Sequence, residues 1–170
     1  MTPGAALWAR VAASTAIAFG LLFLLAPARP SSRLPWPAQP AIGACAGGLL
    51  YLLATRRRPH LPARMGSFPV LLARQGMFGL WAANEEIVWR RVVLGALLPG
   101  GALTALAAST LGFALAHRAH RRLHLGTGAV FGRLYLVTGA LAASVAAHWL
   151  YNALVGGLVD RARGQVGPEQ

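Results

Sequence analysis

The chain has 170 residues, of which 56% are hydrophobic and 12% are charged, about half the charged fraction of an average soluble domain. Since a membrane-spanning helix needs roughly 20 residues, about six crossings with short loops would nearly fill the chain and leave no room for a second domain. The net charge of +12 comes from sixteen arginines and no lysine. These arginines cluster at the ends of apolar runs, which argues against a nucleic-acid-binding stripe and favours a polytopic membrane protein.

Six apolar segments predict an all-α membrane helical bundle with about six transmembrane helices. In chain order they cover residues 5–26, 41–54, 68–98, 102–117, 126–137 and 140–159. Proline-rich or basic loops separate most of them, Pro99-Gly100-Gly101 breaks the chain after the third, and Thr138-Gly139 forms the last turn. We therefore expect residues 1–160 to form a single integral membrane domain and residues 161–170 to form a polar, disordered tail.

The distribution of arginines predicts the orientation of this bundle. With both termini in the cytoplasm, eleven arginines lie on the inner side, whereas only Arg29 and Arg33 lie on the outer side. The positive-inside rule favours this arrangement over its inverse. Ala26-Pro27-Ala28 resembles a signal-peptide cleavage site, but further spans follow it, so we expect an uncleaved first helix. We expect the protein to lie in the bacterial cytoplasmic (inner) membrane.

Small residues give a packing signal that is separate from any chemistry. Gly43 and Gly47, and likewise Gly128 and Gly132, are spaced four residues apart, which allows helices to approach one another closely. Cys45 is the single cysteine of the chain, so an intrachain disulfide and a multi-cysteine metal site are both excluded.

Two of the four acidic residues, Glu85 and Glu86, lie side by side within the long third apolar segment. A carboxylate at such a position costs several kcal/mol and is by default a sign of a functional site. Arg90 follows Glu86 by four residues, so the two share a helix face and predict a structural ion pair. Glu85 points roughly 100° away around the helix and is free to face another helix.

Two further pairs at the same spacing place polar groups at membrane depth. His148 and Asn152 share one helix face, which interhelical hydrogen bonding alone could explain. Phe113 and His117 form the other pair, at the end of the fourth predicted helix. Together the two carboxylates, two histidines and the amide are what water-activating hydrolysis needs, since a carboxylate can take a proton from water while imidazole and amide groups stabilise an oxyanion.

These residues resemble the CPBP family of intramembrane endopeptidases, which comprises CaaX proteases and bacteriocin-processing enzymes and is also called the ABI family. Its three motifs are E-E-x-x-x-R, F-x-x-x-H and H-x-x-x-N, in that order on separate helices. Here they read Glu85-Glu-Ile-Val-Trp-Arg90, Phe113-Ala-Leu-Ala-His117 and His148-Trp-Leu-Tyr-Asn152. The resemblance covers residues 81–154, which is under half of the chain, and leaves out the first two predicted helices.

The resemblance implies a role for each motif residue. Glu85 would be the general base, and His117 would position or activate the water. His148 and Asn152 would form the oxyanion hole. The supporting residues would be Glu86, Arg90 and Phe113.

A metal-dependent version of this mechanism is the alternative to a metal-free one. Glu85, His117 and His148 could supply a Glu/His/His zinc site with an open position. We expect no cofactor, because His148 and the nearby amide already make a reasonable oxyanion hole. A separate surface cluster of His117, His120 and His124 is conceivable, but the arginines around it would repel a cation.

The expected partners are the lipid bilayer and a membrane-embedded or lipid-modified peptide substrate, such as a C-terminal sorting tail or a bacteriocin precursor, and not nucleic acid. Two other classes of function remain open at this point. A non-catalytic immunity or scaffold protein would keep the polar cluster for helix packing. An ion carrier would use it as a proton relay, but the other predicted helices lack a polar path.

Overall fold

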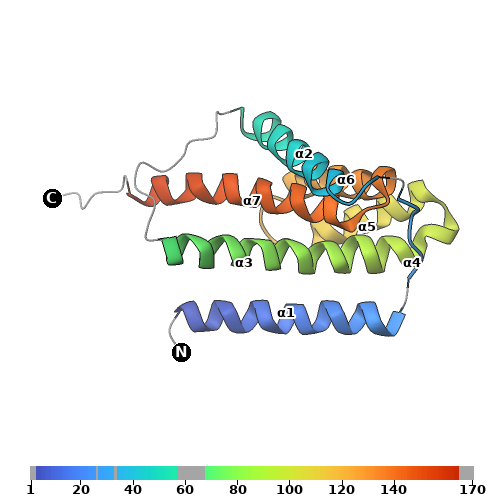
Figure 1. Cartoon of the computed structure of the whole chain (residues 1–170), viewed down its shortest axis with the longest axis horizontal. Helices are drawn as coiled ribbons and strands as arrows, with labels where there is room; N and C mark the ends of the chain where they lie inside the picture. The colour runs from blue at the N-terminus through green and yellow to red at the C-terminus, as the bar shows by residue number, and fades with distance from the viewer. Residues whose placement is uncertain (1–2, 26, 33, 57–67, 165–170) are drawn as a thin grey trace.

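The computed structural model describes residues 3–25, 27–32, 34–56 and 68–164, with side chains described for residues 5–156 of those ranges. Helices connected by short loops make up the described chain, and no strand occurs within these ranges (Figure 1). The elements are α1 (Pro3–Leu25), α2 (Ala38–Thr55), α3 (Phe68–Glu86), the π-helix η1 (Ile87–Leu94), α4 (Gly95–Leu97), the 3-10 helix η2 (Leu98–Gly100), α5 (Ala102–Ala116), α6 (Arg121–Thr138) and α7 (Leu141–Gly164).

The six predicted segments correspond to α1, α2, the continuous run from α3 to η2, α5, α6 and α7, which confirms the all-α bundle. Two boundaries differ from the prediction by five residues, and the others differ by at most three. The helix α6 begins at Arg121, before the predicted residue 126, because its polar first turn continues the helix beyond the apolar stretch. The helix α7 continues to Gly164, so residues 161–164, predicted as disordered tail, are helical. Residues 165–170 and the basic residues 57–64 lie outside the described ranges.

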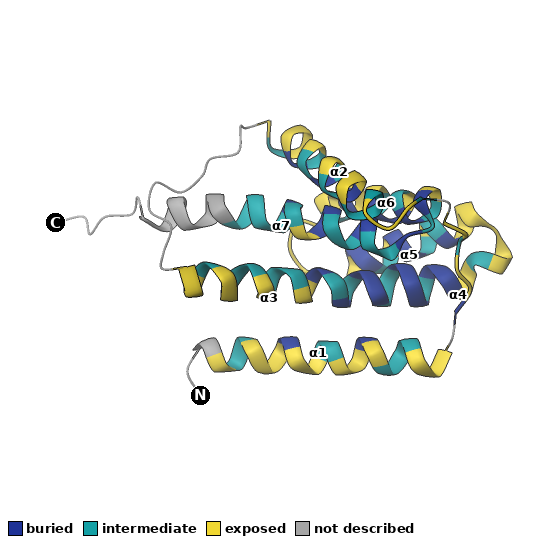
Figure 2. Cartoon of the chain, viewed as in Figure 1, coloured by how far each residue is buried: buried dark blue, intermediate teal, exposed yellow. Residues whose placement is uncertain are grey.

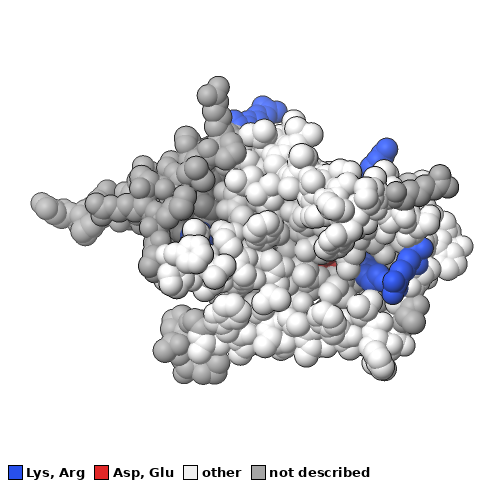
Figure 3. Space-filling model, viewed as in Figure 1, with Lys and Arg blue, Asp and Glu red and all other residues white. Residues whose placement is uncertain are grey.

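Among the described residues, two helices have the length and composition needed to cross a membrane, namely Ala5–Leu25 and Ala38–Thr55, and α5 is a shorter apolar helix. The predicted count of six crossings and the location of the termini stay predictions. Large apolar side chains nonetheless lie exposed on several helices; among them are Phe19, Phe23, Leu53, Leu103, Leu115 and Val137. Figure 3 shows that the visible face carries few charged atoms. An apolar surface of this extent is typical of contact with lipid.

The buried apolar side chains form two clusters, one where α2, α6 and α7 meet and one where η1, α5 and α6 meet. Most described side chains of α1 remain exposed (Figure 2). The helix α1 packs against α3 and η1. Asn84 of α3 anchors it, because its side-chain amide donates hydrogen bonds to the hydroxyls of Ser14 at 2.9 Å and Thr15 at 2.8 Å. The helix α7 contacts α2, α3 and α6, so a residue in the middle of α7 faces the centre of the bundle.

Glycines of α2 let this helix contact the backbone of α7 directly. A Cβ atom at Gly43 would lie 2.1 Å from the carbonyl oxygen of Ala143, and one at Gly47 would lie 2.3 Å from that of Ala147. Real Cβ atoms do not approach other heavy atoms so closely, so larger residues would push the helices apart. The predicted close approach at this glycine pair is confirmed, and it fixes the part of α7 next to His148.

The second predicted pair, Gly128 and Gly132, lets α6 pack closely against side chains of α5. A Cβ atom at Gly128 would lie 3.0 Å from the ring of Phe113, and one at Gly132 would lie 2.5 Å from the side chain of Leu106. The predicted turn after α6 is also present: Gly139 has φ +63° and its N–H caps the helix by donating to the carbonyl of Tyr135 at 2.8 Å. Such a left-handed cap favours glycine.

The third predicted segment is not one regular α-helix. Directly after Glu86 the backbone changes to the π-helix η1, which contains both Arg90 and Arg91. A π-helical stretch of this kind is rare and often lies at a functional site. The side chain of Arg90 points into the bundle, whereas Arg91 donates hydrogen bonds to the carbonyl oxygens of Pro27 and, at 2.8 Å, of Ala28. The run after α1 is thereby tied to η1.

Candidate active site

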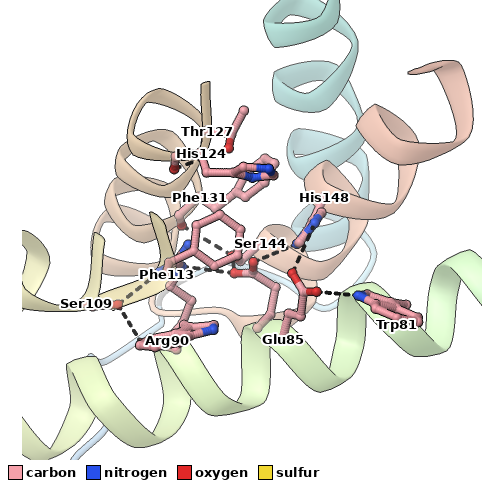
Figure 4. Close-up of polar contacts among 12 residues, drawn as sticks. Trp81, Glu85, Arg90, Ser109, Phe113, His124, Thr127, Phe131, Ser144 and His148 are labelled. Atoms are coloured by element: carbon pink, nitrogen blue, oxygen red, sulfur yellow. Dashed lines mark hydrogen bonds and ion pairs between the residues drawn. The ribbon is translucent and has the colours of Figure 1, made fainter. Parts of the chain in front are cut away.

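Three segments bring the carboxylates and the two motif histidines together, and Figure 4 shows Glu85 and His148 facing each other from different helices. Glu85 lies near the end of α3, His117 directly follows α5, and His148 lies on α7. The Oε2 atom of Glu85 is 3.7 Å from Nε2 of His117 and 3.8 Å from Nε2 of His148. Residues that are far apart in the sequence therefore converge on one carboxylate oxygen, as the resemblance of their motifs to the CPBP family implied.

The other oxygen of Glu85 is held by a residue that the sequence analysis did not select. The indole N–H of Trp81, one turn earlier on α3, donates a hydrogen bond to Oε1 of Glu85. This leaves Oε2 directed at the two imidazoles. The side chain of Glu85 retains 18% of its accessible surface, so a small molecule can still approach it. The four-residue spacing between Trp81 and Glu85 is the signal that could have identified this contact.

Glu86 has no accessible surface and is surrounded by donors. Its Oε2 accepts hydrogen bonds from Nε of Arg90 at 3.1 Å and from the hydroxyl of Ser144, and its Oε1 lies 2.9 Å from Nδ1 of His148. The predicted ion pair between Glu86 and Arg90 is confirmed. The same carboxylate also holds His148, a contact that the sequence analysis did not foresee.

Arg90 is fully buried and extends this network towards α5. Its Nη1 donates to the hydroxyl of Ser109 at 2.9 Å, which in turn donates to the carbonyl of Trp89 at 2.6 Å. The guanidinium lies over the ring of Phe113, with Cζ 5.2 Å from the centroid, a distance typical of cation–π contact. Phe113 therefore contacts the guanidinium of Arg90 as well as the ring of His117.

The hydrogen bond of His117 defines which of its nitrogens can act as a base. Its Nδ1 lies 2.7 Å from the carbonyl oxygen of Phe113. Because a carbonyl can only accept, Nδ1 carries the proton, and in the neutral ring Nε2 is the unprotonated nitrogen. The ring packs against Phe113 at 4.6 Å and stacks on His124 at 3.9 Å between centroids. His124, expected to be part of a basic loop, thus lies beside the site.

His148 is held on two sides. The ring is 4% exposed, stacks on Phe131 at 4.7 Å between centroids, and donates from Nδ1 to the ionised carboxylate of Glu86. Its Nε2 is therefore the nitrogen that faces Glu85. Ser144 lies one turn before His148 on the same face of α7, a spacing that could have indicated its role. Phe131 comes from α6, and no sequence signal pointed to it.

Asn152 lies one turn after His148 on α7, as predicted, and is partly buried. The described residues give no hydrogen bond to its side chain, so its role as an oxyanion donor stays a prediction. The zinc alternative requires Glu85, His117 and His148 to surround one ion. Within the described part of the chain, no three His, Cys, Asp or Glu side chains are grouped so that they could hold a metal ion. The choice between the metal-free and the zinc-dependent mechanism stays a prediction.

A cavity of about 340 Å³ connects the site with the surface between α1 and the run from α3 to η1. Glu85 lies in its wall, together with Ile17, Trp81 and Trp89. One cation, Arg10 of α1, also lines it. The predominantly apolar wall is typical of a pocket that accepts an apolar segment next to a few polar groups.

A carboxylate that faces two imidazoles, in an apolar helical bundle reached through an apolar cavity, is the arrangement expected of a membrane-embedded peptidase. The family model described as type II CAAX prenyl endopeptidase Rce1-like matches residues 67–154. The chain belongs to this Rce1-like family, which agrees with the resemblance seen in its motifs. The matched region contains all three motifs and leaves out α1 and α2. Comparisons with curated proteins and with solved structures found no match.

Proposed function

We propose that this protein is an intramembrane endopeptidase that hydrolyses a peptide bond in a membrane-associated peptide or protein tail through glutamate-activated water and without a metal. The observation that carries the proposal is the position of Glu85 Oε2, which lies 3.7 Å and 3.8 Å from the Nε2 atoms of His117 and His148. Membership of the Rce1-like family supports peptidase chemistry. The mechanism is derived from these contacts.

The distance between Glu85 and His117 suits a bridging water better than a direct contact. At 3.7 Å the two atoms exceed the length of a good hydrogen bond, and both are acceptors when His117 is neutral. One water molecule can donate one hydrogen bond to each of these two atoms. Its oxygen lone pair is then free to attack a carbonyl carbon placed above it, while Glu85 takes the proton as general base.

His148 is suited to stabilise the oxyanion that forms. Its Nδ1 donates to Glu86, and this contact directs Nε2 towards Glu85 and the reacting carbonyl. When Nε2 also carries a proton, it would donate to the oxyanion, with the amide of Asn152 as the proposed second donor. In a site from which water is excluded, each such donor lowers the barrier by about 3–4 kcal/mol.

The reaction is completed by returning the proton to the leaving group. The water oxygen forms a bond to the carbonyl carbon, and its proton moves to Glu85. When the tetrahedral intermediate collapses, the C–N bond breaks and Glu85 passes this proton to the amide nitrogen, which leaves as an amine. The products are a new carboxyl group and a new amino group, and Glu85 returns to its ionised form.

The surroundings of the site support one class of substrate. Apolar side chains of α1, α3 and η1 line the cavity beside Glu85, which supports a membrane-embedded or lipid-modified peptide, such as a C-terminal sorting tail or a bacteriocin precursor. We propose the bacterial cytoplasmic membrane as its location, with six crossings and both termini in the cytoplasm.

The proposed function is tested with the purified full chain in liposomes. A panel of a farnesylated CAAX peptide, its unmodified form and an apolar transmembrane peptide is incubated in ¹⁸O-labelled water and examined by mass spectrometry. We expect cleavage of at least one peptide, with a single ¹⁸O in the new carboxyl group and a rate that changes less than twofold with 1,10-phenanthroline. Intact peptides throughout would contradict the peptidase, and loss of activity with the chelator would contradict the metal-free mechanism.

A further inference from the structure

A second cavity, of about 360 Å³, lies away from the active site. Its wall combines the end of α1, the connection to α2, η1, the end of α6 and the beginning of α7. His117 lies between α5 and α6, whereas this cavity adjoins the turn at Gly139 between α6 and α7. Since α6 runs between these two positions, the cavity is at the opposite end of the bundle from His117.

Among the described residues, two arginines and no carboxylate line this cavity. Arg91 comes from η1 and is 7% exposed, while Arg29 is an exposed residue of the connection that follows α1. The Nη1 group of Arg91 donates hydrogen bonds to the carbonyl oxygens of Pro27 and Ala28, which do not neutralise the charge of the guanidinium. Within the described residues, no ion pair involves either arginine.

Few carboxylates of the chain could neutralise these two arginines. Two of its four carboxylates, Glu85 and Glu86, are engaged in the active site. The others, Asp160 and Glu169, follow in the last eleven residues of the sequence. A largely buried guanidinium without a counter-charge is unfavourable, and a neighbouring Arg29 adds to the local positive potential. An anion from outside the chain would relieve both charges.

Other features of the wall indicate what kind of anion fits. The indole of Trp36 is 70% exposed at the rim, as expected of a tryptophan in the headgroup layer of a membrane. The hydroxyls of Ser32 and Tyr135 and the amide of Gln39 also line the cavity and can donate hydrogen bonds to phosphate oxygens. Guanidinium groups bind phosphate oxygens through short, charge-assisted hydrogen bonds.

We propose that this cavity binds the phosphate of an anionic lipid headgroup, with Arg29 and Arg91 as its cationic ligands. A bound lipid would bridge α1, the connection to α2, and the turn between α6 and α7. It would also explain the presence of Arg29 on the side of the membrane from which the positive-inside rule excludes arginine. This site does not depend on the peptidase reaction, because none of its residues contacts Glu85, His117 or His148 through the interactions described above.

The test measures thermal unfolding of the purified full chain in neutral detergent while phosphatidylglycerol, phosphatidylcholine or inorganic phosphate is added. We expect phosphatidylglycerol to raise the Tm of the wild type, and Arg29→Gln to increase the half-saturating lipid concentration about fivefold. Arg29→Lys should restore most of the effect. The control Arg56→Gln removes an equal charge from an exposed site at the far end of α2 and should behave as the wild type.

Three outcomes would overturn the proposal. A response to phosphatidylglycerol that is the same in Arg29→Gln and the wild type would mean that the lipid acts elsewhere. An equal response to phosphatidylcholine would remove the need for an anionic headgroup. Stabilisation by inorganic phosphate in the absence of any response to phosphatidylglycerol would identify the ligand as a soluble anion instead of a lipid.

Discussion

The Nδ1 atom of His148 lies 2.9 Å from Oε1 of Glu86, so the second glutamate of the motif orients a histidine that faces the first. The arrangement parallels the buried carboxylate that orients the histidine of a hydrolytic triad. Glu86 therefore has three partners in the bundle, namely Arg90, Ser144 and His148, and the adjacent carboxylates differ in role. Glu86 is enclosed by donors, whereas Glu85 keeps one oxygen available.

Replacing Glu86 by glutamine should destabilise the fold and abolish cleavage. The substitution leaves the fully buried Arg90 without its anion, and breaking a buried ion pair in this way typically costs about 3–5 kcal/mol. Chemical unfolding in detergent measures the loss of stability. A variant with wild-type stability would show that Arg90 does not depend on this carboxylate.

Replacing Ser144 by alanine should have a smaller effect of the same kind. The buried hydroxyl donates to Glu86, and loss of one hydrogen bond to a charged group costs about 1.5–3 kcal/mol. Unfolding measurements should show this loss, and kcat should fall while Glu86 retains His148. Ser31→Ala, at an exposed serine, is the control and should match the wild type. An unchanged stability of Ser144→Ala would argue against the hydrogen bond.

The packing of α2 on α7 gives a prediction with an adjacent control. Gly47→Ala would place a Cβ atom 2.3 Å from the carbonyl oxygen of Ala147, so the helices must separate at a cost of about 1–3 kcal/mol. At Gly48 a Cβ atom meets only Leu150, at 3.9 Å, and Gly48→Ala should stabilise the helix by about 0.5–1 kcal/mol. Equal Tm changes in the two variants would contradict this packing.

The stacking of His124 on His117 predicts a kinetic effect. With His124→Ala the ring of His117 loses its neighbour at 3.9 Å and should sample other orientations, which lowers kcat about tenfold with little change in KM. His124→Phe keeps an aromatic ring in place and should recover most of the activity. If both variants lose activity equally, the imidazole of His124 has a chemical role instead of a packing role.

Much of the site could be predicted because several of its contacts join residues that are one helical turn apart. Glu86 and Arg90, like Phe113 and His117, contact each other across one helical turn, and this spacing is visible in the sequence. The long-range convergence of Glu85, His117 and His148 was not visible in spacing alone. It was expected because the motif order resembles a known family.

The parts that were missed depend on tertiary structure. Phe131 stacks on His148 from a different helix. A phenylalanine in an apolar segment does not indicate such a contact in the sequence. Similarly, the π-helix after Glu86 and the second cavity result from packing between several elements. The sequence pattern defines which helix face is polar, but it does not define which neighbour that face meets.

The most direct test of the proposed mechanism is kcat of Glu85→Gln, measured beside the wild type on the same cleaved peptide, with unfolding stability determined on the same samples. Glutamine can still accept the hydrogen bond from Trp81 but cannot take a proton from water. We predict a loss of kcat of at least about 100-fold, since general-base catalysis contributes about 10²–10⁴-fold, and stability within about 1 kcal/mol of the wild type. Cleavage by a folded Glu85→Gln at a rate within a few fold of the wild type would contradict the assignment of Glu85 as the base.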